Sequence, residues 1–163
     1  MKISSFFQTI IIALAFSLFT ATLPATAQTT AAPAETLFHR LGGFDAVAAV
    51  TDDFLERLAT DPQLGRFFLG QGNDSKMRTR QHVVNFICNA TGGPCFYTGR
   101  TMVLTHKGMG ITAEDWEISM GHLVGTLDKF QVPSPEREEV IAFIDSLRPT
   151  IVDAEIGTTA PAK

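Results

Sequence analysis

The histidines and cysteines are the residues through which this sequence can do metal, redox or nucleophilic chemistry. Cys88 and Cys95 flank a Gly-Gly-Pro turn, His82 precedes the pair, and His106 follows it. This spacing alone is compatible with a metal site, a redox pair, a Cys/His catalytic couple, or a disulfide beside another site. A zinc ion held by all four residues is one alternative, although the spacing matches no familiar structural zinc site.

The other two histidines show no spacing that suggests a ligand. His39 lies in the segment LFHRLGG and is interpreted as an exposed or half-buried surface residue. His122 directly precedes the apolar Leu123 in a helical repeat, so we interpret it as a residue at the flank of a buried face.

The N-terminal residues predict export. Lys2 is followed by the apolar run FFQTIIIALAFSLF at residues 6–19, which is too short and too interrupted by polar residues for a membrane span. Ala25-Thr26-Ala27 then resembles a signal-peptidase site. We predict a secretory signal peptide over residues 1–27, a linker over residues 28–35, and a periplasmic or secreted product without membrane attachment after cleavage.

The net charge of the chain limits its possible partners, and its predicted compartment limits the possible roles of the cysteines. Without Lys2, twelve Lys and Arg face seventeen Asp and Glu, a net charge of 12 − 17 = −5, and no basic stretch invites nucleic acid. Cysteine pairs outside the cytosol are normally oxidised, which favours a disulfide between Cys88 and Cys95. The intervening Gly-Gly-Pro permits the required chain reversal. Closing so short a loop is expected to contribute about 2 to 3 kcal/mol.

The elements that must position these residues are all helical, because apolar residues recur at steps of three and four and no segment alternates like a strand. The pattern therefore predicts a small all-α domain. A capping box at Thr112 should open one helix and Pro149 should kink the last. The predicted segments are a helix over 45–59, a short turn of helix over 62–69, a helix over 76–91, one from Thr112 to before Pro133, and one from Ser134 carrying Val140, Ile144, Leu147 and Ile151.

Residues 92–111 remain as a long segment that is rich in glycine and contains His106. A compact helical domain seldom contains twenty such residues without a functional reason.

Three parts of the sequence resemble group 1 truncated haemoglobins. They are LGGFDAVAAVTDDFLERLATDPQLGRFF at 41–68; ATGGP at 90–94 with YTGR at 97–100, Met102 and HKGMGI at 106–111; and Trp116 with GHLV at 121–124. The resemblance implies a two-over-two helical sandwich around haem. It also implies a globin domain over residues 36–155. We further predict a flexible tail over residues 156–163 and a monomer.

The resemblance further implies that His106 is the proximal ligand of a b-type haem iron, with its second ring nitrogen held by a hydrogen bond. Phe68 is expected to pack on the haem plane. Val47, Val50 and the stripe that begins at Val140 are interpreted as ordinary helix packing. The other residues expected to line the pocket are Phe54, Phe86, Met102, Ile111 and Trp116.

The distal side departs from the common family pattern, because Leu55 stands where tyrosine is common and Val83 where glutamine is common. Thr79 occupies a third distal position. With these two donors missing, slow release of oxygen is not expected. His82 is hypothesised to be a second axial ligand of the iron; the alternative is that it turns outward and pairs with a haem propionate.

The resemblance implies reversible binding of O2, NO or CO, and an unidentified reductant. Two alternatives stay open: NO dioxygenation or peroxidase chemistry, and electron transfer outside the cytoplasm. The missing tyrosine and glutamine lower the dioxygenase alternative, as does the need for a reductase outside the membrane.

Overall fold

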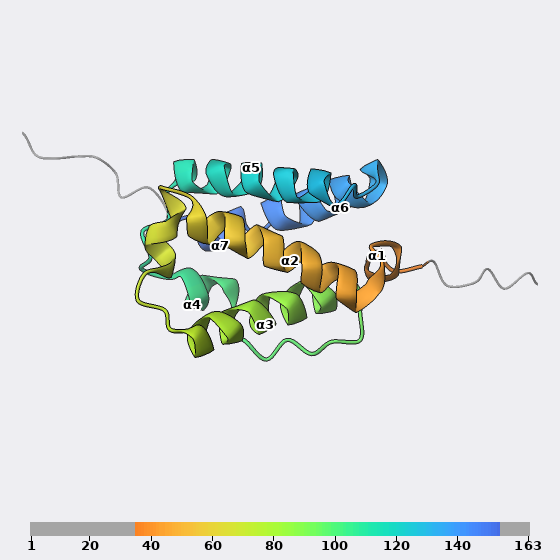
Figure 1. Cartoon of the computed structure of the whole chain (residues 1–163), viewed down its shortest axis with the longest axis horizontal. Helices are drawn as coiled ribbons and strands as arrows, with labels where there is room; N and C mark the ends of the chain where they lie inside the picture. Colours follow the sequence, from red (N-terminus) through yellow and green to blue (C-terminus); the bar gives the residue numbers. More distant parts are fainter. Residues whose placement is uncertain (1–34, 154–163) are drawn as a thin grey trace, which may run out of the picture. The chain divides into compact units, whose positions relative to one another are not determined.

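The computed structural model describes residues 35–153, and within them every regular element is a helix, as predicted (Figure 1). The predicted signal peptide, residues 28–34 of the predicted linker, and the predicted tail lie outside the described residues. In chain order the elements are α1 (Leu37–Arg40), α2 (Gly43–Thr60), η1 (Leu64–Phe68), α3 (Asn73–Ala90), α4 (Met102–His106), α5 (Ala113–Lys129), α6 (Ser134–Asp145) and α7 (Arg148–Ile151).

The helices form two pairs, α2 with α3 and α5 with α6, and α2 also packs against α5 (Figure 1). This is the predicted two-over-two arrangement. Buried Leu123, Leu127 and Val140 form a core between the pairs, against which half-buried Val50 and Phe54 pack. A second cluster joins Phe38, Val47 and Cys88 near the start of α2.

Local chemistry sets several of the helix ends. Gly42 precedes α2 with a φ of 97°, a left-handed conformation that favours glycine. At the start of α5 the predicted capping box is confirmed: the Thr112 hydroxyl accepts from the Asp115 N–H at 3.1 Å, and the Asp115 carboxylate accepts from the Thr112 N–H at 2.9 Å.

Three predicted boundaries were wrong. Helix α3 begins at Asn73 and not at residue 76, so Asp74 lies in its first turn, where a carboxylate interacts favourably with the positive end of the helix dipole. At the C-terminus Pro149 does not kink one long helix, because α6 already ends at Asp145 and α7 is separate. Residues 92–111 also contain the short helix α4.

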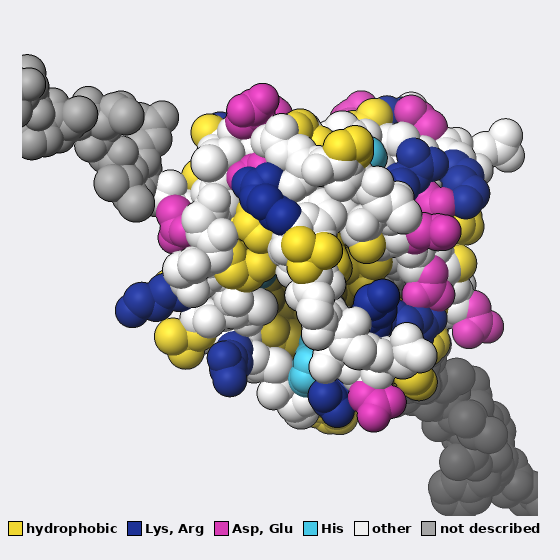
Figure 2. All heavy atoms as spheres, turned by 60° about the vertical axis from the view of Figure 1, so that its left-hand side comes forward, with side chains coloured by type: hydrophobic (Ala, Val, Ile, Leu, Met, Phe, Trp, Pro, Cys, Tyr) yellow, Lys and Arg dark blue, Asp and Glu magenta, His cyan; other side chains and the backbone are white. Residues whose placement is uncertain are grey.

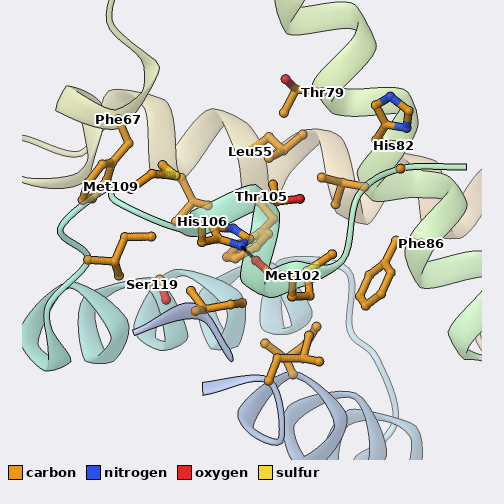
Figure 3. Close-up of a pocket in the computed structure, with 18 of the residues that line it drawn as sticks. Leu55, Phe67, Thr79, His82, Phe86, Met102, Thr105, His106, Met109 and Ser119 are labelled. Carbon is orange, nitrogen blue, oxygen red and sulfur yellow. Dashed lines mark hydrogen bonds between the residues drawn. The ribbon is translucent and has the colours of Figure 1, made fainter. Parts of the chain in front are cut away.

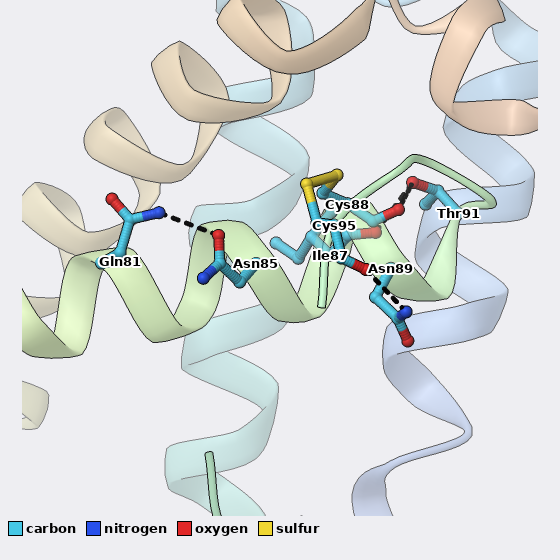
Figure 4. The surroundings of a disulfide bond; sticks show 7 residues. All are labelled: Gln81, Asn85, Ile87, Cys88, Asn89, Thr91 and Cys95. Atoms are coloured by element: carbon cyan, nitrogen blue, oxygen red, sulfur yellow. Dashed lines mark hydrogen bonds between the residues drawn. A yellow bond between two sulfur atoms is a disulfide. The ribbon is translucent and has the colours of Figure 1, made fainter. Parts of the chain in front are cut away.

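The disulfide between Cys88 and Cys95 is present, with a Cα–Cα distance of 5.8 Å (Figure 4). It joins the last turn of α3 to the following loop, where the Asn89 side-chain amide also donates to the Cys95 carbonyl at 2.9 Å. Gly93 sits so close beneath it that an added Cβ would lie 2.7 Å from the Cys88 sulfur and 2.6 Å from the Phe38 ring. The Gly-Gly-Pro turn is therefore packed tightly against the core.

No helix within residues 35–153 is long and apolar enough to cross a membrane.

Candidate functional site

A largely apolar cavity of about 540 Å³ lies between α2, α3, α4, α5 and α7, and its lining residues surround His106 in Figure 3. Its size is within the range of sites for small molecules and cofactors. All eleven pocket residues expected from the sequence line it: Phe54, Leu55, Phe68, Thr79, His82, Val83, Phe86, Met102, His106, Ile111 and Trp116.

His106 is the last residue of α4, a helix of five residues whose start is capped by the Thr101 hydroxyl. Its Nδ1 lies 2.9 Å from the carbonyl oxygen of Met102, one turn earlier. Because a carbonyl oxygen only accepts, Nδ1 must carry the proton, which leaves the lone pair of Nε2 free for a metal. The short helix thus fixes both the tautomer and the orientation of the ring.

The cavity is also lined by side chains from helices other than the one that carries His106: Leu55 on α2, and Thr79 and Val83 on α3. Leu55 and Val83 are apolar, so among these three side chains the Thr79 hydroxyl is the group that can form a hydrogen bond with a ligand. An apolar surface of this kind gives a small ligand little electrostatic stabilisation.

Tyr97 organises the rim of the cavity. Its ring meets Phe86 edge-on at 5.1 Å between centroids and His82 at 6.3 Å, and its hydroxyl donates to the Arg100 carbonyl at 2.6 Å. An added Cβ at Gly99 would lie 2.4 Å from the tyrosine ring, so the motif YTGR needs glycine there. His82 and Arg100 are both exposed at this rim (Figure 3 shows His82).

Residues 36–153 match the family described as bacterial-like globin. The chain belongs to this globin family. It is 37% identical over 121 residues to the group 1 truncated haemoglobin of Mycolicibacterium paratuberculosis, covering 74% of this chain and 87% of the relative. This places the globin among the group 1 truncated haemoglobins.

Two solved structures share the fold of this globin. THB1 of Chlamydomonas reinhardtii is 32% identical with a TM-score of 0.62, and the match covers 75% of this chain and all of that one. The 2/2 haemoglobin of Synechococcus, solved in the cyanomet state with covalently attached haem, is 26% identical with a TM-score of 0.63. That match covers 70% of this chain and 94% of the other.

The cavity of this globin fits haem, which the family implies. An imidazole with a free Nε2 stands in a largely apolar cavity, which suits a metal within an apolar macrocycle. Arg100 and His82 at the rim suit the carboxylates of such a group. Members of this family bind small diatomic molecules such as O2.

The structure of this globin does not support the zinc site or the Cys/His catalytic couple that the sequence left open. Both cysteines are consumed in the disulfide, so neither is a zinc ligand or a nucleophile. Within residues 35–153 no group of three or more His, Cys, Asp or Glu side chains is placed to hold a metal ion. His122 pairs with Asp61 at 2.8 Å and His39 is exposed, in agreement with their interpretation as surface and flank residues.

Sequence reasoning missed part of the cavity wall. The stripe of Ile144, Leu147 and Ile151 was predicted to serve helix packing alone, but all three line the cavity. After the break that follows Asp145, the separate helix α7, which carries Ile151, packs against α4. The motif YTGR was a signal for Tyr97, Gly99 and Arg100. The remaining lining residues were not assigned to the pocket from the sequence, although Leu58, Leu64, Phe67 and Met109 lie in the quoted motifs: Leu58, Leu64, Phe67, Gln71, Ile87, Thr105, Met109, Asp115 and Ser119.

Asp115 is a charged residue in the wall, with only 1% of its surface exposed. Burial raises the pKa of this carboxyl, but donors outweigh it: the N–H and hydroxyl of Thr112, the amide of Gln63, and the guanidinium of Arg66 at 2.6 Å. Together they lower its pKa to about 2. The carboxylate thereby links η1 to the start of α5 beside the cavity.

Replacing Asp115 by asparagine should lower the free energy of unfolding at pH 7 by about 1 to 2 kcal/mol. Since the folded pKa of Asp115 lies below the unfolded value of 3.8, its ionised form stabilises the fold above pH 3.8. That stabilisation is lost as the pH falls toward 2. Urea unfolding of the haem-loaded proteins at pH 7 and pH 3 should therefore show a smaller difference between variant and parent at pH 3.

The exposed neighbour Glu114 supplies the matched control, since Glu114→Gln also removes one carboxylate from the first turn of α5. It should change the unfolding free energy by less than about 0.5 kcal/mol at both pH values. Equal losses in the two variants would contradict a special role for Asp115.

A second, smaller apolar cavity of about 50 Å³ lies deeper in this globin, between α2, α5 and α6. Phe54, Ile87 and Ile144 line both cavities. These three side chains therefore separate two neighbouring cavities, one at the site and one in the core.

Proposed function

We propose that this globin holds a b-type haem through Nε2 of His106 and binds O2, NO or CO reversibly on the opposite side. The hydrogen bond between His106 Nδ1 and the Met102 carbonyl carries this proposal, because it directs the free Nε2 as an iron ligand. When bound, haem would supply an iron that His106 would hold and to which a diatomic ligand could bind. The sequence has no Cys-x-x-Cys-His, and both cysteines are in a disulfide, which supports haem without thioether bonds.

The side chains of the distal wall favour reversible binding over oxygen chemistry. Leu55 and Val83 donate no hydrogen bond, and a neutral donor such as the Thr79 hydroxyl contributes only about 1 kcal/mol. NO dioxygenation and peroxidase chemistry both need stronger stabilisation of developing charge. We therefore rank these enzymatic activities below ligand binding.

His82 as a second axial ligand stays a prediction. Its side chain is exposed at the rim and contacts Tyr97 edge-on, which supports the alternative that it turns outward to a haem propionate. We propose this outward placement for the ligand-binding state.

Flash photolysis of the carbon monoxide complex tests both proposals. In the ferrous protein, CO is expected to rebind at a rate proportional to its concentration, and His82→Leu should change that rate by less than about twofold. If His82 competed for the iron, the rate in the parent would level off at high CO and the variant would remove this limit. A ferrous protein whose Soret band does not change with CO would contradict ligand binding itself.

Export to the periplasm or the exterior, a monomeric state, and a reductant remain proposals. The predicted signal peptide supports export, as does the disulfide, which is typical of oxidising compartments.

A further inference from the structure

Charged residues are divided unevenly between the segment that forms most of the cavity wall and the rest of the domain. Residues 71–111 contain five Lys and Arg and one acidic residue, Asp74. The remaining described residues, 35–70 and 112–153, contain six Lys and Arg and fifteen Asp and Glu. Most of the cavity wall therefore belongs to a segment with a net positive charge, whereas the rest of the described domain is acidic.

The basic residues also differ in their pairing. All six outside residues 71–111 form ion pairs: Arg40, Arg57, Arg66, Lys129, Arg137 and Arg148. Inside the segment only Arg80 does, with Asp52. Lys76, Arg78, Arg100 and Lys107 are exposed, and none of them takes part in an ion pair within residues 35–153. Their charge is therefore available to a partner.

These four cations belong to segments that border the cavity. Arg100 lines it and Lys107 directly follows His106. On α3, Lys76 lies three positions before Thr79 and seven positions before Val83, and this spacing places it on the helix face toward the cavity. Arg78 lies one turn before His82 on the same helix. Figure 2 shows Lys and Arg side chains around a hollow whose walls are hydrophobic.

Haem itself neutralises only part of this charge. Its two carboxylates can be matched by Arg100 and His82, which belong to the rim. Lys76, Arg78 and Lys107 remain, and we call these three residues the cationic rim. The same segment, residues 71–111, also carries exposed apolar side chains, with Phe96 84% and Leu104 57% exposed. Protein interfaces typically combine central apolar contacts with a polar rim.

We propose that the cationic rim docks an acidic electron-donor protein beside the haem. This rests on the proposed function, in which the iron must be ferrous to bind O2 or CO. The donor loses one electron and ferric iron gains it, with no transfer of atoms. Opposite charges steer such an encounter and orient the donor toward the cavity mouth.

Binding is measured with oxidised plant-type ferredoxin, an acidic [2Fe–2S] protein, as a fluorescently labelled probe added to the ferric haem protein. Anisotropy titrations compare the parent with Lys76→Glu/Arg78→Glu and with the control Arg137→Glu/Arg148→Glu, which makes the same charge change in surface ion pairs on α6 and α7. We expect Kd to rise at least about tenfold in the rim variant and less than about threefold in the control. Raising the salt from 0.02 to 0.3 M should weaken parental binding by about tenfold or more.

Equal effects in the two variants, or no binding of the probe at low salt, would overturn the proposal. Tighter binding to phosphatidylglycerol vesicles or duplex DNA than to ferredoxin would also overturn it, by assigning the rim to another class of partner. The CO spectrum of every variant is recorded in parallel. Ferredoxin binding without a CO response would reject the proposed function, whereas a normal CO response without ferredoxin binding would reject only the docking site.

Discussion

His106→Ala should lose haem at least about 100-fold faster than the parent, because haem would keep its apolar contacts but lose its protein ligand to the iron. Changes to groups that merely orient a metal ligand cost 10 to 100-fold in affinity, so loss of the ligand itself should cost no less. The measurement is the rate of haem transfer to excess apomyoglobin, followed by absorption in the Soret region.

A small external base separates lost coordination from lost folding. Imidazole added to His106→Ala can occupy the space of the missing ring, and should restore a six- or five-coordinate Soret band and slow haem transfer. His39→Ala, which changes an exposed histidine away from the cavity, should release haem at the parental rate. Parental haem retention by His106→Ala would show that another residue holds the iron.

Loss of the disulfide should produce the second large effect, a fall of about 2 to 3 kcal/mol in the free energy of unfolding. The double variant Cys88→Ala/Cys95→Ala removes the bridge without placing a hydroxyl at the fully buried position 88. Since the bridge ties the end of α3 to the loop that leads to Tyr97 and Arg100, haem should also be released faster in mild urea. Urea unfolding and haem transfer measure the two effects.

Ligand chemistry should be preserved in this double variant, because neither cysteine lines the cavity. The CO rebinding rate is therefore expected to stay within about twofold of the parent. Chemical reduction of the parental disulfide should reproduce the faster haem release without any substitution. Parental haem retention in both cases would contradict the proposed link between the bridge and the cavity rim.

The helical periods of the sequence predicted the fold class and the capping box at Thr112, since both depend on neighbours along the chain. The family resemblance selected eleven residues that the structure brings together around one cavity. Their roles toward haem remain predictions. The turn Gly-Gly-Pro and the neighbouring cysteines likewise predicted a local bridge that the structure confirms.

Features that depend on distant residues could not be predicted in this way. Helix α4 is only five residues long, so its local preferences are weak, and it depends on the Thr101 cap and on packing against α7. The net charge of the whole chain conceals the cationic rim, because Lys76 and Lys107 are far apart in sequence and belong to different segments beside the cavity, α3 and the end of α4. Buried Asp53 likewise joins α2 to α5 across the fold, through buried Thr126 and exposed Lys129.

The small cavity beside Phe54, Ile87 and Ile144 has a consequence for how ligand release is observed. A diatomic molecule is poorly hydrated, so dry apolar space next to the site can hold it at little cost. In the proposed ligand-binding function, a released molecule could remain inside the protein long enough to recombine before it reaches solvent. The rate at which a scavenger in solution captures the ligand would then be lower than the rate at which the bond breaks, because only the molecules that escape are captured.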